Sequence, residues 1–308
     1  MTTAQLPDFA RPIRAGTTQP SRLQAITPAA MPDVARDLAP DFAIVTLVTD
    51  KAQYAEMSDS FVAGGFTPDT CEYLVIDNTD ATNQSCAYRG LNRALAAARA
   101  PYVILCHQDV RLVDDNRDTL EQRLHDLEQN HPEWALAGNA GGASAGTLAV
   151  RISDPHGQDQ CVGTFPHRVF TLDENFIIVR RDAQIGFSRN LSGFHFYGAD
   201  ICMAADAMGW EAYVIDFHLH HLSPGKKDAS FEIAKEAFRA KWSKALRPRL
   251  LQTTCALIDL TSTTLGRWVA PWREAAIEKV TRRLPSATGW TKPSPTKPNP
   301  VIAIRKAA

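Results

Sequence analysis

Three apolar stretches set the architecture: FAIVTLV at positions 42–48, EYLVIDN at 72–78 and YVILC at 102–106. Each is short, continuous and rich in β-branched residues, which is typical of strands buried on both faces of a sheet. The segments between them favour helices, because apolar residues recur there at helical spacing and SCAYRGLNRALAAARA (85–100) is rich in helix formers. This alternation predicts an α/β fold with a doubly wound sheet.

Later segments continue the pattern. Helices are predicted near 118–130, 199–209, 228–244 and 250–284, the last interrupted at Pro271, and strands at 134–138, 176–180 and 211–221. The Gly-rich stretch GNAGGASAGT (138–147) lacks the Gly-Lys-Ser/Thr of a phosphate loop, so we expect a flexible loop there, with a lid over a ligand as the alternative.

Composition narrows the class of protein. The 308 residues are 44% hydrophobic and 22% charged, as in soluble globular domains, and no apolar run reaches the roughly 18 residues of a membrane span. The N-terminus lacks the apolar core of a secretory signal, and the six cysteines form no CxxC pair, so we expect reduced thiols and a cytoplasmic location. A net charge of −1 argues against a nucleic-acid binder.

Polar residues follow the predicted strands at their carboxyl ends. In an open α/β sheet, ligands bind beyond these ends, and Asp77, His107 and Asp109 occupy such positions. An aspartate there can bind Mg²⁺ or Mn²⁺ and leave positions for a substrate's phosphates. Asp109 could equally close the next turn, and the residues alone leave both interpretations open.

The order of FAIVTLV, LVIDN, an Arg/Asn-containing helix and ILCHQDV resembles the GT-A glycosyltransferases of the family-2 type. The sequence is most similar to a branch described as "glycosyltransferase-like", in which an HQD triplet stands in place of D-x-D. GFHFYGADICMAADAMGWEAYVIDFHLHHLS (193–223) resembles the same branch, so the likeness covers about 42–223. It implies a GT-A mixed sheet and a nucleotide-diphosphate sugar as donor, with a UDP-sugar as the first choice.

The resemblance also implies a role for individual residues. Those expected to contact the donor are Thr46, Asp77, Asn92, Arg93, His107 and Gln108. Those expected to hold the divalent metal, Mn²⁺ or Mg²⁺, are Asp109 and one of His220 and His221. Those expected to line the acceptor and sugar pocket are Asp173, Glu174 and His195.

Asp200, in YGAD, matches the general base of the family. A base on the far side of the anomeric carbon takes the proton of the acceptor hydroxyl, and the metal neutralises the leaving diphosphate. This arrangement predicts in-line displacement with inversion, onto a glycan or a lipid-linked acceptor. The chemistry needs one aspartate at a strand end and one separated, free aspartate.

Several of these residues have simpler explanations. Asp77 could close a β-turn, Asp200 could cap a helix, and Asp173 with Glu174 could form a solvated turn. On a strand His218 and His220 share one face while His221 points the opposite way, and no HExxH or Cys pair supports a zinc hydrolase.

Two other functions stay open. A nucleotidyltransferase would need a basic Gly-rich loop after the first strand, where Lys51 is the lone cation. A non-catalytic sugar- or nucleotide-binding module is kept open by His107, which stands where a carboxylate is usual.

The chain divides by composition into an N-terminal arm predicted to be disordered (1–40), a GT-A catalytic domain (41–223), a basic helical extension (224–288) and a Pro-rich tail (289–308). Positions 224–308 carry a net charge of +11 and positions 1–223 one of −12. LGRWVAPWREAAIEKVTRRL (265–284) interleaves Trp with Arg and Lys, a pattern of helices at anionic membrane surfaces. The alternative, slightly favoured because Pro271 breaks the stripe, is a helix whose aromatic residues pack on the catalytic domain.

Overall fold

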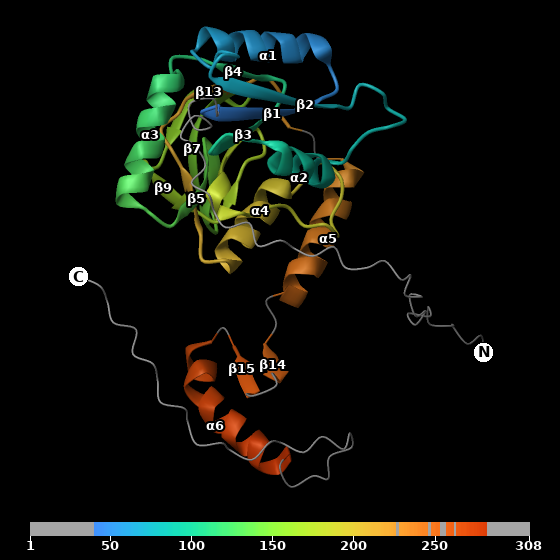
Figure 1. Ribbon diagram of the computed structural model, residues 1–308, viewed down its shortest axis with the longest axis vertical. Helices are drawn as coiled ribbons and strands as arrows, with labels where there is room; N and C mark the ends of the chain where they lie inside the picture. Colours follow the sequence, from blue (N-terminus) through green and yellow to red (C-terminus); the bar gives the residue numbers. More distant parts are fainter. Residues whose placement is uncertain (1–39, 226–227, 246–247, 253–256, 262, 282–308) are drawn as a thin grey trace, which may run out of the picture.

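The computed structural model describes residues 40–225, 228–245, 248–252, 257–261 and 263–281. The Pro-rich tail and all but the last residue of the predicted N-terminal arm lie outside these residues. Within them the chain forms two sheets flanked by helices and a small C-terminal hairpin with its own helix (Figure 1).

The first sheet has the strand order β2-β1-β3-β11-β5-β12-β9. Its strands are β1 (Phe42–Val48), β2 (Cys71–Asp77), β3 (Tyr102–Cys106), β5 (Trp134–Gly138), β9 (His167–Val169), β11 (Phe176–Arg180) and β12 (Glu211–Val214). β1 runs parallel to β2 and β3, whereas β11 runs antiparallel to β3 and β5. The predicted mixed α/β fold class is therefore confirmed.

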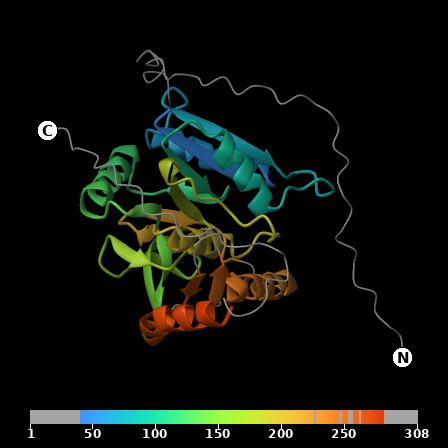
Figure 2. The same cartoon turned by 60° about the horizontal axis from the view of Figure 1, so that its bottom comes forward.

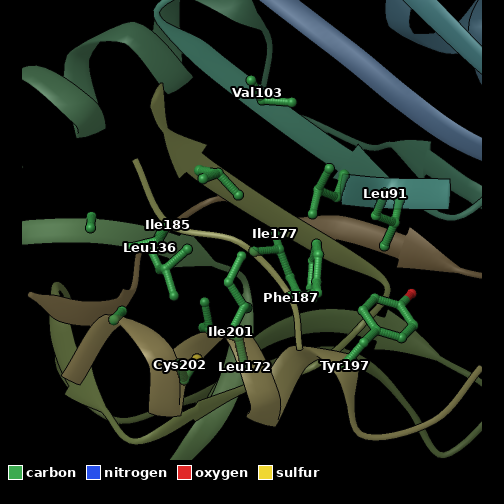
Figure 3. Close-up of a cluster of buried hydrophobic side chains, with 14 of the residues drawn as sticks. Leu91, Val103, Leu136, Leu172, Ile177, Ile185, Phe187, Tyr197, Ile201 and Cys202 are labelled. Atoms are coloured by element: carbon green, nitrogen blue, oxygen red, sulfur yellow. The ribbon is translucent and has the colours of Figure 1, made fainter. Parts of the chain in front are cut away.

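Helices cover both faces of this sheet. They are α1 (Lys51–Ala63), α2 (Ala87–Ala97), α3 (Arg117–Asn130) and α4 (Tyr197–Ala207). Successive residues of β1 alternate between two apolar cores, with Phe42 and Ile44 joining α1 and α3, and Ala43 and Val45 joining α2 and α4. Figure 3 shows part of the second core, where side chains of α2, the sheet and α4 turn toward one another. Because both faces of the sheet are buried, its central strands are continuous apolar runs in the sequence.

A second sheet packs beside the first, with the order β10-β6-β7-β13-β4 and β8 paired to β7. Its strands are β4 (Val110–Leu112), β6 (Ala140–Ser144), β7 (Thr147–Asp154), β8 (Gly157–Val162), β10 (Thr171–Leu172) and β13 (Leu219–His221). β13 pairs antiparallel with β4, so His221 lies opposite Val110. This pairing brings a residue from late in the chain beside the segment that follows β3.

Three predictions of secondary structure are wrong. The Gly-rich stretch 138–147 contains strand β6 and is not a flexible loop. Its glycines serve the close pairing of strands, since a Cβ on Gly141 would overlap the Thr171 carbonyl oxygen of β10. The predicted strand 211–221 splits into β12 and β13, which belong to different sheets. The predicted helix 250–284 begins only at Thr264, after two strands.

The C-terminal part contains α5 (Ala229–Ala245), β14 (Arg249–Gln252), β15 (Leu257–Leu260) and α6 (Thr264–Thr281). The predicted helix near 228–244 is confirmed as α5. β14 and β15 form an antiparallel hairpin, and α6 packs on β15 (Figure 2). Among the described residues, no helix combines the length and the apolar character needed to cross a membrane.

Candidate active site at the carboxyl edge of the sheet

Segments distant in sequence meet at one edge of the first sheet. β1 and β3 are parallel, so their carboxyl ends lie at this edge. β11 is antiparallel to β3, with Phe176 opposite Cys106, so the residues preceding β11 reach the same edge. The His107 backbone N–H donates to the Asn175 carbonyl oxygen at 2.9 Å and fixes the contact. Asp173 and Glu174 are thereby placed near the HQD triplet.

His107, Asp109 and His221 form a compact cluster. One donor atom from each lies within 4.8 Å of the others. His221 Nε2 is 3.4 Å from Asp109 Oδ1, and His107 Nδ1 is 4.0 Å from the same oxygen. The side chains of Asp109 and His221 are 16% and 12% exposed, whereas that of His107 is 38% exposed. The cluster is therefore enclosed on one side and open on the other.

The cluster fits a divalent metal ion. His221 Nε2 is buried and pairs with the Asp109 carboxylate at 3.4 Å, without a hydrogen bond of good geometry. A metal ion between the two side chains would use this nitrogen and the carboxylate oxygen as ligands. Two imidazole nitrogens with one carboxylate oxygen suit first-row transition metals better than Mg²⁺, which prefers oxygen ligands. The side on which His107 is exposed leaves room for ligands from a substrate.

The charges of the cluster depend on one another. Burial opposes ionisation of Asp109, but His221 and His107 outweigh it and hold the pKa of this carboxyl below its usual value. Burial likewise opposes the charged form of His221, yet Asp109 raises the pKa of this imidazole. For His107, burial and then the neighbouring His221 lower the pKa, so its ring is neutral. Without a metal, the cluster is an Asp109–His221 ion pair beside a neutral imidazole.

Tyr197 orients His107. Its hydroxyl donates to the Glu174 carbonyl oxygen at 3.2 Å and lies 2.8 Å from His107 Nε2. In the tautomer with the hydrogen on Nε2, the tyrosine oxygen accepts from Nε2–H while its own hydrogen goes to Glu174, and the lone pair of His107 is on Nδ1, toward Asp109. Tyr197 was not predicted from the sequence, although it stands in YGAD, three residues before the predicted base.

The carboxyl group of Glu174 is a weaker acid than an ordinary glutamate. Burial, and then the nearby Asp173 charge, raise its pKa to about 7. Its Oε1 accepts from the Gly198 N–H at 3.3 Å. A Cβ on Gly198 would overlap the Leu172 carbonyl oxygen, so this close approach of backbone requires glycine. A carboxyl group that titrates near neutral pH suits proton transfer.

A groove of about 750 Å³ runs between the edge strand β2 and helix α2. Asp77 lies at its end, exposed, where Thr79 N–H and Oγ1 donate to the carboxylate and Lys51 Nζ lies 3.6 Å away. The hydrogen bonds from Thr79, with a contribution from Lys51, lower the pKa of Asp77. Arg93, a predicted donor contact, lines the groove, and so does Arg89, which was not predicted from the sequence. The i,i+4 spacing of two arginines on one helix was the available signal.

Of three further predicted donor contacts, one is buried within a strand and two have hydrogen-bond partners inside the protein. Thr46 is buried inside β1, short of the strand end, with no partner for its hydroxyl. Asn92 bonds both the N–H and the carbonyl oxygen of Phe187. Gln108 Oε1 accepts from the N–H groups of Thr49 and Asp50 and so links β3 to the start of α1.

Asp200 is not free. Its side chain is fully buried and accepts from Ser188 N–H at 2.7 Å, Ser188 Oγ at 2.6 Å and Trp242 Nε1 at 2.9 Å, with Lys241 Nζ at 3.8 Å. This carboxylate ties α4 to α5 and to the segment before α4. The predicted separated, free aspartate is therefore absent in this conformation, and the role of Asp200 as base stays a prediction.

The remaining predicted residues lie apart from the cluster. His195 Nε2 is 3.2 Å from Ser230 Oγ, and its ring meets that of Phe231 at the start of α5. His220 alternates with His221 along β13 and points to the other face, so of the two histidines His221 is the one near Asp109. An apolar groove of about 570 Å³ lies close by, lined by Phe196, Met203, Phe231, Phe238 and Trp242 of the α4–α5 region with Lys235, Arg239 and Ser243.

Fold and site together define an α/β protein with a candidate divalent-metal centre at the carboxyl edge of its sheet. No family model matches the sequence. The chain is 37% identical over 225 residues to a protein of Fuscovulum blasticum named "ATP synthase subunits region ORF 6", an alignment that covers 71% of this chain and 90% of that protein. The chain therefore belongs to the same family as that protein, whose name states no activity.

Two solved structures resemble the fold. One is TarS residues 1–349 of S. aureus in complex with UDP-GlcNAc, with a TM-score of 0.47, 15% identity and coverage of 67% of either chain. The other is the mannosyltransferase PcManGT of Pyrobaculum calidifontis in complex with GDP-Man and Mn²⁺, with a TM-score of 0.46, 15% identity and coverage of 80% of this chain and 76% of the other.

Proposed function

We propose that the protein is an inverting glycosyltransferase that moves a sugar from a nucleotide-diphosphate donor to a hydroxyl group of a glycan or lipid-linked acceptor. The observation that carries the proposal is the cluster of His107, Asp109 and His221, a set of metal-ligating side chains at the edge where α/β sheets bind ligands. The resemblance of the HQD triplet to glycosyltransferases of the family-2 type points to the same reaction.

In this proposal the donor spans two places on the edge. The nucleoside lies in the groove between β2 and α2, where Asp77 accepts from a ribose hydroxyl and Arg89 and Arg93 face the negative charge of the donor. A metal ion held by His107, Asp109 and His221 would neutralise the charge that develops on the leaving diphosphate. Tyr197 keeps the Nδ1 lone pair of His107 aimed at that position.

The acceptor oxygen forms the new bond to the anomeric carbon as the bond to the diphosphate breaks, so the nucleoside diphosphate leaves. The acceptor proton passes to a carboxylate. Glu174 is our first candidate for this base, because its pKa is about 7 and it lies beside the cluster. Asp200 is the second, on the resemblance, and would first have to lose its bonds to Ser188 and Trp242.

The test is the thermal stability of the full chain with UDP, GDP, CDP and ADP, each with and without Mn²⁺. We expect one diphosphate to raise the melting temperature, and to do so only with Mn²⁺. Stabilisation by a diphosphate that is equal without metal would contradict the proposed metal bridge. The second step measures release of that diphosphate from the corresponding nucleotide sugar. Release by the wild-type chain but not by the Asp109→Asn variant would establish transfer or hydrolysis of the sugar.

One observation favours a second function, a non-catalytic module that binds nucleotides or sugars. The carboxylate of Asp200, the family's general base by resemblance, is saturated by its partners. Such a module would bind the diphosphate and the sugar donor with Mn²⁺ yet release no product with any acceptor. The discriminating experiment is single turnover of the donor. Turnover by the wild-type chain that is abolished in Glu174→Gln but retained in Asp206→Asn, on the exposed side of α4, would exclude this function.

A further inference from the structure

The hairpin β14–β15 and helix α6 form a small C-terminal unit in which one face of α6 is fixed. Ala270 is buried, the Asp259 N–H donates to Glu274 Oε1 at 2.6 Å, and Arg273 Nη1 lies 2.9 Å from Asp259 Oδ2. Asp259 itself is buried on β15. These contacts determine which side of α6 faces the hairpin.

The opposite face of α6 carries its largest apolar side chains. Leu265, Trp268 and Trp272 are 71%, 71% and 74% exposed. Their spacing of three and four residues places them on one stripe, which points away from the hairpin. The expectation that the aromatic residues of this helix pack on the catalytic domain is therefore wrong. Burying two tryptophans and a leucine is worth several kcal/mol in general, so such a stripe needs an apolar partner.

The charge of this region is strongly positive. Positions 246–308 hold 11 Lys and Arg residues but 3 Asp and Glu residues, whereas positions 1–223 carry a net charge of −12. On α6 itself, Arg267 and Lys279 are exposed. A second copy of the same face would bring together two C-terminal segments, each with a net charge of +8 over positions 246–308, which opposes a symmetric dimer through it.

We propose that this face of α6 binds the surface of an anionic lipid bilayer. Tryptophan side chains favour the headgroup region because they combine a large apolar ring with an N–H donor. Leu265, one turn before Trp268, would enter the acyl boundary beside the two tryptophans, and Lys279, on the same side of the helix, would face lipid phosphates. This is binding at the surface, and it does not depend on the proposed sugar transfer.

The test is sedimentation of the full chain with vesicles of phosphatidylcholine containing 30% phosphatidylglycerol, compared with pure phosphatidylcholine. The wild-type chain should bind the anionic vesicles, bind pure phosphatidylcholine at least about tenfold less, and lose binding as salt is raised. The double variant Trp268→Ala/Trp272→Ala should bind anionic vesicles at least about tenfold more weakly.

The matched control is Leu148→Ala/Phe170→Ala, which removes two large exposed apolar side chains from the second sheet and its margin. It should bind vesicles like the wild type. Equal binding by the Trp268→Ala/Trp272→Ala variant, or no binding by the wild type, would overturn the proposal. So would self-association in the absence of lipid that is lost in the tryptophan variant, because a second copy would then be the partner of this face.

Discussion

Asp109 and Asp200 were assigned by sequence to two halves of one reaction, but their surroundings differ. Asp109 lies beside two histidines, pairs with His221 at 3.4 Å, and has a side chain that is 16% exposed. Asp200 is completely buried and accepts three hydrogen bonds within 3 Å. A carboxylate that is partly open and flanked by metal-ligating side chains is prepared for a ligand, whereas one saturated with hydrogen bonds holds structure together. The comparison separates a binding role from a structural role for two chemically identical groups.

The largest expected effect is the loss of donor turnover when Asp109, the carboxylate with the proposed binding role, is replaced. Asp109→Asn removes the carboxylate next to both histidines and should lower metal-dependent donor turnover at least about 100-fold, while loss of the ion pair with His221 should lower the melting temperature without unfolding the chain. Steady-state turnover and melting temperature measure the two quantities. Asp69→Asn, an exposed aspartate after α1, is the matched control and should leave both unchanged. A stable Asp109→Asn protein with normal turnover would end the assignment.

Asp200→Asn tests the structural side. Loss of charge-assisted bonds to Ser188 and Trp242 in a buried site should lower the free energy of unfolding by about 2–4 kcal/mol, measured by chemical denaturation. Binding of Mn²⁺ should persist, because the metal cluster lies on other elements. Asp206→Asn on the same helix is exposed and should cost less than about 0.5 kcal/mol. If Asp200→Asn were as stable as the control, the buried network would not hold α5 in place.

A smaller effect is expected at Tyr197. Tyr197→Phe removes the hydrogen bond that fixes the His107 ring, and the metal affinity should fall about tenfold. Titration with Mn²⁺ measures the loss, and Tyr88→Phe, which removes a buried hydroxyl bonded to the His195 carbonyl oxygen, is the control. Equal Mn²⁺ affinity in the two variants would show that Tyr197 does not orient the ligand.

The smallest effect concerns pH. The pKa of Glu174 is raised to about 7 in the folded chain, so between its ordinary pKa and about 7 the folded state holds a proton that the unfolded state has released. This group therefore lowers stability as pH rises through that interval. Glu174→Gln should gain melting temperature relative to the wild type between about pH 4.5 and 7 and show no further gain above it. A difference independent of pH would contradict the raised pKa.

The sequence predicted the first half of the fold well because local signals agree there. In β1–α1–β2–α2–β3, strand runs, helical spacing and short connections all point to parallel strands, and this order places Asp77 and Asp109 at one edge. The metal cluster was predicted only in part. Choosing His221 over His220 depends on the pairing of β13 with β4, a contact between residues more than 100 positions apart. Local patterns do not contain such a register.

Other features were hidden for the same physical reason. The burial of Asp200 is caused by Trp242, which arrives 42 residues later on α5. The glycines of 138–147 looked like a flexible loop, yet Gly141 is needed because β10 approaches so closely. On α6 the alternation of Trp and Arg was visible, but which face points outward depends on the contacts of Asp259 with Arg273 and Glu274.

The most direct test of the account is Mn²⁺ bound to the full chain, observed by electron spin-echo envelope modulation. The account predicts one bound ion with nitrogen couplings from two imidazoles, from one imidazole in His221→Ala, and no bound ion in Asp109→Asn. Absence of bound Mn²⁺ in the wild type, or an unchanged spectrum in both variants, would contradict the assignment of His107, Asp109 and His221 as the metal centre.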